Sequence, residues 1–235
     1  MRRSTREKLK AGARLSIVIP VLNEAAVIAR ALANLQALRA RRVEVIVVDG
    51  GSEDGTSEIA RGFVDRIIVA PRGRAAQMNA GADVANGEAL LFLHADSSLP
   101  EDADRLILDA LKSSHWGRFD VRLSGSHPLF RLIEALMNVR SRLSGIATGD
   151  QGIFVRRNTF YEYGGYPDIA LMEDIALSKR LKQAGRPACL RQRIVTSSRR
   201  WEENGVVRTV IKMWFLRLAY ALGASPKRLA HIYGR

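Results

Sequence analysis

The chain has 235 residues, of which 47% are apolar, and Lys plus Arg outnumber Asp plus Glu by 37 to 24. This length and apolar fraction suit one well-packed domain, and the single cysteine, Cys189, excludes an internal disulfide and agrees with a reducing compartment. The net charge of +13 favours anionic partners, such as phosphorylated substrates, nucleic acid or an acidic membrane surface.

A basic tail occupies residues 1–14, where six Arg and Lys residues face one acid, Glu7. The apolar run that begins at Leu15 ends at Pro20, which is too short for a secretory signal. A later apolar stretch, 209–223, carries two basic residues and is too short to span a bilayer. The sequence therefore predicts a cytoplasmic protein, with peripheral association at the inner face of the membrane as a further expectation.

Strand-like and helix-like runs alternate over the first half of the chain. Strands are predicted at 15–19, 43–48, 66–69 and 89–93, with helices between them at about 25–38, 55–62, 74–84 and 101–111. This alternation predicts a mostly parallel sheet with crossover helices.

The second half is less regular. It is predicted to hold a strand at 116–123, an amphipathic basic helix at 128–144, a strand at 152–155, a helix from about Glu173 and a helical region at 205–232. We expect one domain over 15–235, in which a nucleotide-binding half (15–98) precedes an acceptor and catalytic half (99–235).

The segment VEVIVVDGGSEDGT (43–56) has the pattern of a ligand site at a strand end. Asp49 follows a buried strand, and Gly50-Gly51-Ser52 opens a turn into the next helix. Ligands of open α/β sheets bind beyond the carboxyl ends of strands, where glycines allow close approach and helix starts offer N–H groups to anions. Because Asp49 can accept hydrogen bonds from a base or ribose, the segment predicts a nucleotide site.

A second acid, Asp96, follows the apolar strand that ends in LFLHADS. A carboxylate there can hold a divalent cation, which bridges the phosphates of a nucleoside diphosphate. Asp96 is level with Asp49 if their two strands are neighbours. A strand-end aspartate that caps the turn to Ser98 is the alternative interpretation.

A third acid, Asp174, shares one helix face with Leu177 and Leu181. An acid on that inward stripe either pairs with a base or lines a cleft, where desolvation raises its pKa and suits it to general-base work. Simple stabilisation of the helix dipole is the alternative. Three weaker stretches carry polar residues suited to a diphosphate or a sugar, namely PRGRAAQMNAGA (71–82), GDQG (149–152) and SSRRW (197–201).

Taken in order, these motifs resemble those of the family 2 glycosyltransferases, which have the GT-A fold. The resemblance runs from Leu15 to about Tyr233 and includes SIVIPVLNE (16–24) and GGYPDIALMEDIALSKRLKQAG (164–185) beside the motifs above. NVRSR (138–142) and the ending LGASPKRLAHIY resemble a small, soluble bacterial subgroup often found near radical SAM enzymes.

The resemblance implies an α/β fold of GT-A type, with a Rossmann-like, mostly parallel central sheet flanked by helices and a mixed C-terminal acceptor half. It implies inverting transfer of a single sugar from a nucleotide-diphosphate sugar to an acceptor hydroxyl or phosphate, with Mn²⁺ or Mg²⁺ as the divalent metal. The acceptor itself stays open, lipid-linked ones included.

The resemblance also implies residue roles. Asp174, paired with Glu173, is the expected catalytic base, and Asp96 the expected ligand of the metal and diphosphate. The expected nucleotide-sugar residues are Pro20, Asn23, Glu24, Asp49, Gly51, Arg74, Asn79 and Asp96, and those for acceptor or diphosphate are Gly149, Asp150, Gln151, Arg200 and Trp201.

Two positions depart from the family pattern. His94 replaces the first acid of Asp-x-Asp, so metal binding rests on Asp96 alone. Ser197 replaces the glutamine of the Gln-x-x-Arg-Trp motif of processive relatives. Together with the lack of transmembrane helices, this favours a single sugar transfer over processive synthesis with export.

Other interpretations account for part of the sequence. An NAD-type oxidoreductase needs Gly-x-Gly-x-x-Gly after the first strand, and a GT-A nucleotidyltransferase needs a glycine-rich basic loop there; neither motif is present. A non-enzymatic binder of nucleic acid or another anionic ligand, on a degenerate transferase fold, would use the positive charge, yet the basic residues are spread along the chain without a binding module.

Anionic lipid, or a lipid-phosphate acceptor, is a further explanation of the charge. The basic N-terminus and the helix at 209–223, with Trp214, Phe215 and Tyr220, motivate it. Ordinary core packing is the simpler interpretation of that helix.

Overall fold

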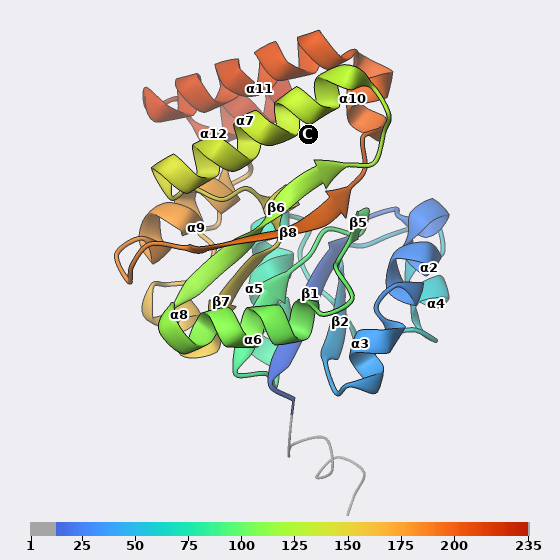
Figure 1. The fold of residues 1–235 in the computed structure, drawn as a ribbon. Coiled ribbons are helices and arrows are strands. Elements are labelled where there is room, and N and C mark those ends of the chain that lie inside the picture. Colours follow the sequence, from blue (N-terminus) through green and yellow to red (C-terminus); the bar gives the residue numbers. More distant parts are fainter. Residues whose placement is uncertain (1–12, 235) are drawn as a thin grey trace, which may run out of the picture.

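The computed structural model describes residues 13–234, so all but the end of the basic tail expected at 1–14 lies outside the described residues. Within them, eight strands form one sheet in the order β3-β2-β1-β4-β7-β6-β8-β5 (Figure 1). The strands are β1 (Leu15–Val21), β2 (Glu44–Asp49), β3 (Arg66–Val69), β4 (Ala89–Phe92), β5 (Ser97–Ser98), β6 (Trp116–Leu123), β7 (Ile153–Arg156) and β8 (Ala188–Thr196).

The first four strands of this order are parallel, which confirms the predicted sheet of the N-terminal half. β7 runs antiparallel to both β4 and β6, and β8 is parallel to β6. β1 lies between β2 and β4, so the strands that precede Asp49 and Asp96 are not neighbours. The condition for Asp96 to be level with Asp49, that their strands are neighbours, is therefore not met, and β1 separates them.

Helices cover both faces of the sheet, and α7, α10, α11 and α12 lie at the upper end of the molecule in Figure 1. The helices are α2 (Ala25–Ala33), α3 (Gln36–Ala40), α4 (Thr56–Ala60), α5 (Arg74–Val84), α6 (Ala103–Ser113), α7 (Pro128–Ser144), α8 (Arg157–Glu162), α9 (Glu173–Leu181), α10 (Arg199–Asn204), α11 (Val206–Ala221) and α12 (Pro226–Tyr233), with a 3-10 turn, η1 (Gly149–Gln151). Within residues 13–234, no helix is both long and apolar enough to cross a membrane.

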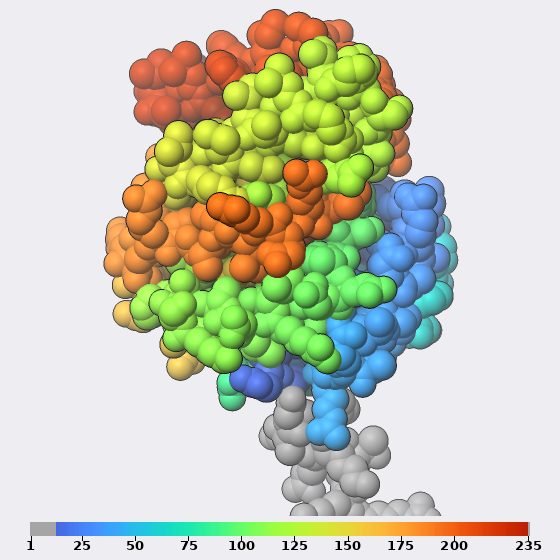
Figure 2. Space-filling view, viewed as in Figure 1, coloured from blue at the N-terminus to red at the C-terminus, as the bar shows by residue number. Residues whose placement is uncertain are grey.

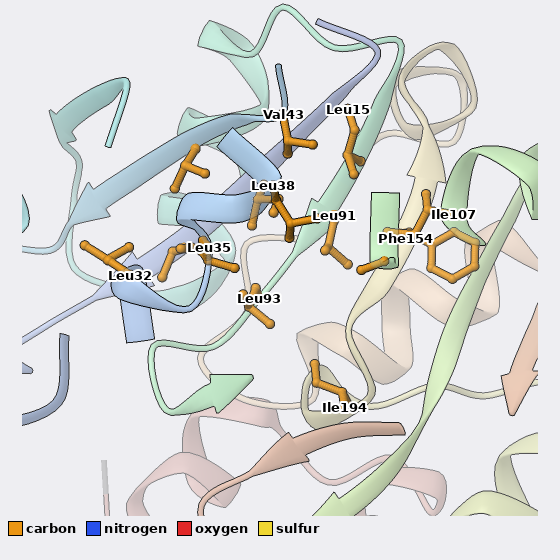
Figure 3. Close-up of a cluster of buried hydrophobic side chains, with 14 of the residues drawn as sticks. Leu15, Leu32, Leu35, Leu38, Val43, Leu91, Leu93, Ile107, Phe154 and Ile194 are labelled. Carbon is orange, nitrogen blue, oxygen red and sulfur yellow. The ribbon is translucent and has the colours of Figure 1, made fainter. Parts of the chain in front are cut away.

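Alternation along the buried strands divides the core between the two faces. In β1, Ile17 and Ile19 point to a cluster that includes α2, α3 and α6, whereas Val18 points to a cluster that includes α5, α8 and α9. Figure 3 shows the first cluster, in which Leu32, Leu35 and Leu38 pack against strand residues such as Leu91. Because both faces are covered, the central strands are almost continuously apolar.

Several elements differ from the predicted ones. β8 was not predicted, because most of ACLRQRIVT is exposed or half-buried and shows no apolar run. The helix predicted at 25–38 is two helices that break at Asn34 and Leu35, and the region predicted at 205–232 breaks between Gly223 (φ 92°) and Pro226. A left-handed glycine followed by proline at a helix start separates two helices in this way.

Candidate functional site

A cleft of about 250 Å³ lies at the edge of the sheet where β1 and β4 end. Parallel strands present their carboxyl ends at one edge, where ligands of such folds bind. Nine of the predicted site residues line this cleft, namely Glu24, Arg74, Asp96, Gly149, Asp150, Glu173, Asp174, Arg200 and Trp201. Residues as far apart in sequence as Glu24 and Trp201 thus meet around one space.

Asp174 enters the cleft from the first turn of α9, which follows Met172 at φ 70°. Its two carboxylate oxygens accept hydrogen bonds from the backbone N–H groups of Gly149 (2.9 Å) and Ile175 (2.7 Å). Burial, and after it the charge of buried Glu173, together raise the pKa of Asp174 to about 6. A carboxylate with this pKa is ionised at neutral pH yet basic enough to accept a proton.

Three guanidinium groups also line the cleft. Arg74 begins α5, and Arg199 and Arg200 begin α10. The pKa of Arg200 is lowered by burial and by the charge of Arg74, which shows that the two cations are close. Arg200 also lies over the ring of Tyr233, 4.5 Å from its centroid. Guanidinium groups grouped in this way suit a phosphate-rich ligand, because each can donate two parallel hydrogen bonds.

His94 connects the end of β4 to η1. Its Nδ1 lies 3.4 Å from Oδ1 of Asp150, and a Cβ added to Gly149 would lie 2.5 Å from its Nε2. Burial alone would raise the pKa of Asp150, but the hydrogen bond from His94 and the charges of Arg74 and Arg200 hold it below its usual value. Asp150 is therefore an anion in the cleft. In the sequence, His94 stands out only as the replacement of an acid, and its contact with Asp150 depends on the fold.

Gln151 and Asn79 are predicted site residues that do not line the cleft. Gln151 is fully buried and accepts a hydrogen bond from the Thr148 N–H (3.2 Å), which holds η1 in place. Asn79 exchanges two hydrogen bonds with the backbone of Tyr166 (2.9 and 3.0 Å) and anchors that loop to α5. Both amides support the walls of the cleft in this structure.

Pro20, Asn23, Asp49 and Gly51 also lie outside the lining residues. Oδ1 of Asp49 accepts hydrogen bonds from the N–H groups of Gly51 (3.0 Å) and Ser52 (2.8 Å), and Ser57 donates to Oδ2. Burial would raise the pKa of Asp49, but the hydrogen bonds from Ser57 and Ser52 hold it below its usual value.

Asn23 lies in the turn after β1 and connects it to the turn after β2. Its backbone has φ 54°, and the next residue, Glu24, occupies the N-cap position of α2. The side-chain oxygen of Asn23 accepts a hydrogen bond from the Glu53 N–H (2.9 Å), and the backbone N–H of Asn23 donates one to Ser52 Oγ (2.9 Å). The turns after β1 and β2 therefore form one connected rim, and Glu24 leads from it into the cleft.

Metal binding has a limited set of donors here. Among residues 13–234, no group of three or more His, Cys, Asp or Glu side chains is placed to hold a metal ion. Asp96 is exposed toward the cleft, and its charge, after burial, is a cause of the raised pKa of Glu24. Mg²⁺ commonly binds through one or two carboxylates together with substrate phosphates. These donors fit a cation whose coordination is completed by the oxygens of a bound diphosphate.

Comparison with known proteins agrees with this geometry. Residues 16–162 match the sequence profile described as Glycosyl transferase family 2. A protein named PGL/p-HBAD biosynthesis glycosyltransferase, from Mycobacterium bovis, is 43% identical over 98 residues, which are 39% of this chain and 38% of that protein. The chain thus aligns with well under half of that relative's length.

Solved structures show the same fold. The mannosyltransferase PcManGT from Pyrobaculum calidifontis, in complex with GDP-Man and Mn²⁺, superimposes with a TM-score of 0.65 at 21% identity, covering 95% of this chain and 70% of that one. Glucosyl-3-phosphoglycerate synthase from Mycobacterium tuberculosis, with Mn²⁺, UDP and glucosyl-3-phosphoglycerate, gives 0.63 at 17% identity, covering 95% and 87%. The fold is accordingly of GT-A type, as the sequence predicted.

Proposed function

This chain belongs to glycosyl transferase family 2, and we propose that it moves a single sugar from a nucleotide-diphosphate sugar to an acceptor, with inversion at the anomeric carbon. One observation carries the proposal. A carboxylate of raised pKa, Asp174, faces the same cleft as the guanidinium cluster of Arg74, Arg199 and Arg200. A base for the acceptor and a positive site for a departing diphosphate are the two groups that direct displacement requires.

In the proposed mechanism, Asp174 accepts the proton of an acceptor hydroxyl. The acceptor oxygen forms a bond to the anomeric carbon while the bond from that carbon to the diphosphate oxygen breaks. The electron pair leaves with the diphosphate, whose negative charge Arg74 and Arg200 stabilise. A phosphate acceptor that is already ionised would need no base. A divalent cation held by Asp96 and the diphosphate would neutralise further charge.

The donor nucleotide is proposed to lie along the rim formed by the turns after β1 and β2. Pro20, Asn23, Asp49 and Gly51 come together there, next to Glu24 in the cleft. The sugar and diphosphate would then reach Asp96 and Arg74. In this proposal, 15–98 binds the nucleotide, and 99–235 supplies the base, the acceptor site and the arginines Arg199 and Arg200 for the diphosphate, within one transferase unit.

Thermal unfolding in the presence of UDP, GDP, dTDP and CDP, each with and without Mn²⁺, tests the proposal. A ligand at about a hundred times its dissociation constant stabilises the folded state by roughly 2.7 kcal/mol, which is a measurable shift in midpoint. We expect one nucleoside diphosphate to stabilise the protein, and more strongly with Mn²⁺.

NAD and duplex DNA serve as comparison ligands in the same assay. Stabilisation by none of the nucleotides, together with tight and salt-sensitive DNA binding, would support the non-enzymatic alternative instead. Transfer is then followed directly as release of the nucleoside diphosphate that stabilises the protein.

A further inference from the structure

Helix α7 (Pro128–Ser144) is apolar on both of its faces. Its inward face buries Phe130 and Ile133 against β6. Its opposite face carries large apolar side chains at intervals of three and four residues, which are Leu129, Leu132, Leu136, Val139 and Leu143, exposed by 39 to 76%. No charged residue interrupts this stripe on the helix. Burial in the core does not explain it.

Helix α11 (Val206–Ala221) repeats the pattern. Thr209 and Leu216 are buried on the inward face, and Trp214 is 66% exposed. The outward face carries Val207, Ile211, Trp214, Phe215, Leu218 and, at the C-cap, Leu222, exposed by 55 to 79%. Core packing is therefore not the role of Trp214 and Phe215, although Tyr220 does pack against the buried cluster of α11 and α12.

These two helices lie side by side. Phe130 and Ile133 of α7 share one buried cluster with Val206 and Val210 of α11, and both helices lie at the upper end of the molecule in Figures 1 and 2. Of the fifteen large hydrophobic side chains exposed in residues 13–234, eleven belong to these two stripes. Apolar exposure concentrated to this degree marks an interaction surface. We call these eleven residues the apolar surface.

We propose that the apolar surface docks on an anionic phospholipid bilayer, with α7 and α11 lying in the interface. Charge selects this partner. From Val206 to Tyr233 the chain has five basic residues and no acid, and α7 has three basic residues and one acid, Glu134. That acid is buried and forms an ion pair with Arg131 (2.9 Å), and Arg142 forms one with Asp120 (2.6 Å), so the excess positive charge comes mainly from the helices at 206–233. Helices with an apolar face and basic flanks bind anionic membranes in this orientation.

A second copy of the chain fits the surface less well. A symmetric dimer would bring the same patch, with its basic flanks, against itself, and like charges held in apposition are repulsive. Insertion across the membrane does not fit either, because an α-helix of 16 residues is only about 24 Å long. A bilayer surface satisfies both the apolar face and the charge.

Docking on a bilayer would also bring the cleft close to the membrane surface. The inward face of α11 lines it with Thr209, Met213 and Leu216, so the helix that carries half of the apolar surface is also a wall of the cleft. This step rests on the proposed transferase function, and it assigns the acceptor to the membrane-bound, lipid-linked class. Vesicle binding itself does not depend on transfer, so the two ideas can fail separately.

Sedimentation with vesicles tests the docking. The full chain is mixed with vesicles of phosphatidylcholine alone or with about one third phosphatidylglycerol. We expect binding to the anionic vesicles, weakened when NaCl rises from about 0.1 M to about 1 M, which shortens the Debye length from about 10 to about 3 Å. Insertion of Trp214, the most exposed tryptophan, shifts its fluorescence to the blue, and Trp214→Phe removes that shift while binding persists.

Leu218→Gln and Leu136→Gln probe α11 and α7 separately, because both side chains are more than half exposed and neither substitution disturbs the core. Each should weaken vesicle binding about tenfold, corresponding to about 1.4 kcal/mol of lost apolar burial. Val69→Gln, at a 79% exposed position on β3, is the matched control and should bind as the unaltered chain does.

Equal binding by all three variants, or no vesicle binding by the unaltered chain, overturns the proposal. A dimer that Leu218→Gln dissociates, with no vesicle binding, would assign the surface to a second copy instead. Stabilisation by a nucleoside diphosphate, measured on the same variants, should be unchanged. If that stabilisation is absent in every form while vesicle binding follows the pattern above, the proposed function fails and the docking does not.

Discussion

Replacement of Asp174 by asparagine should remove its function as a base and, separately, change how the stability of the fold depends on pH. Burial and the charge of Glu173 raise the pKa of Asp174 from 3.8 to about 6. A group whose pKa is raised by folding binds more protons in the native than in the unfolded state, so the wild type loses stability as pH rises from about 4 to about 6. With pKa values of 3.8 in the unfolded and about 6 in the folded state, proton linkage lowers the free energy of unfolding by about 2 kcal/mol between pH 4.5 and 7.5.

Asparagine cannot ionise, so the variant should lack that loss. The amide has one acceptor oxygen and would satisfy only one of the N–H groups of Gly149 and Ile175, which costs about 1–3 kcal/mol at every pH. A constant offset of this kind cancels when two pH values are compared. The stability of Asp174→Asn relative to wild type should therefore improve by about 2 kcal/mol from pH 4.5 to 7.5.

Urea unfolding at both pH values measures this difference, provided that the slope with urea is the same in both proteins. Asp168→Asn, at an exposed carboxylate outside the cleft, is the control and should show no such change. Transfer by Asp174→Asn should fall by a factor of about 10² to 10⁴ while nucleotide binding persists. A stability difference that is the same at both pH values would refute the reasoning about Asp174, and full turnover would refute its role as base.

Three other perturbations have expected outcomes. Asp96→Ala should abolish the additional stabilisation that Mn²⁺ gives to a nucleoside-diphosphate complex, as followed by thermal unfolding; an unchanged Mn²⁺ effect would place the cation elsewhere. Arg74→Gln should weaken binding of the diphosphate about tenfold or more by calorimetry, since it removes a charged hydrogen-bond donor, and unaltered affinity would remove Arg74 from the donor site. Gly81→Ala should destabilise the fold by about 1–3 kcal/mol in urea, because its Cβ would lie 2.3 Å from Cγ1 of Val18, whereas Gly62→Ala, with no atom within 4 Å, should not.

Local pattern was sufficient for much of the fold. The strands at 66–69 and 116–123 and the helices at 74–84 and 128–144 have the predicted bounds, because their periodicity and end signals agree. β8 could not be found in this way, since its pairing with β6 does not depend on an apolar run of its own. Hydrogen bonding to a distant strand leaves no mark in the local sequence.

The site divides along similar lines. Asp96 and Asp174 could be located because an acid at a strand end, or on the inward face of a helix, is conspicuous against its neighbours. Thr209, Met213 and Leu216 could not, since they are ordinary helix residues that line the cleft only because α11 packs there. Polar residues in a motif are ambiguous in another way, as Asn79 shows. Its amide is occupied by the backbone of Tyr166, and sequence does not reveal which partner an amide will take.

The distribution of charge links the cleft to the surface of the molecule. The residues that line the cleft include four arginines and five carboxylates, so its own formal charge is close to zero although the chain carries +13. Binding of a donor diphosphate therefore accounts for little of the basic excess. The helices at 206–233, which include the α11 half of the apolar surface, carry basic residues and no acid, and a field of one sign outside the active site acts on association with an extended anionic partner. An anionic bilayer that also carries the acceptor would give that excess charge a function.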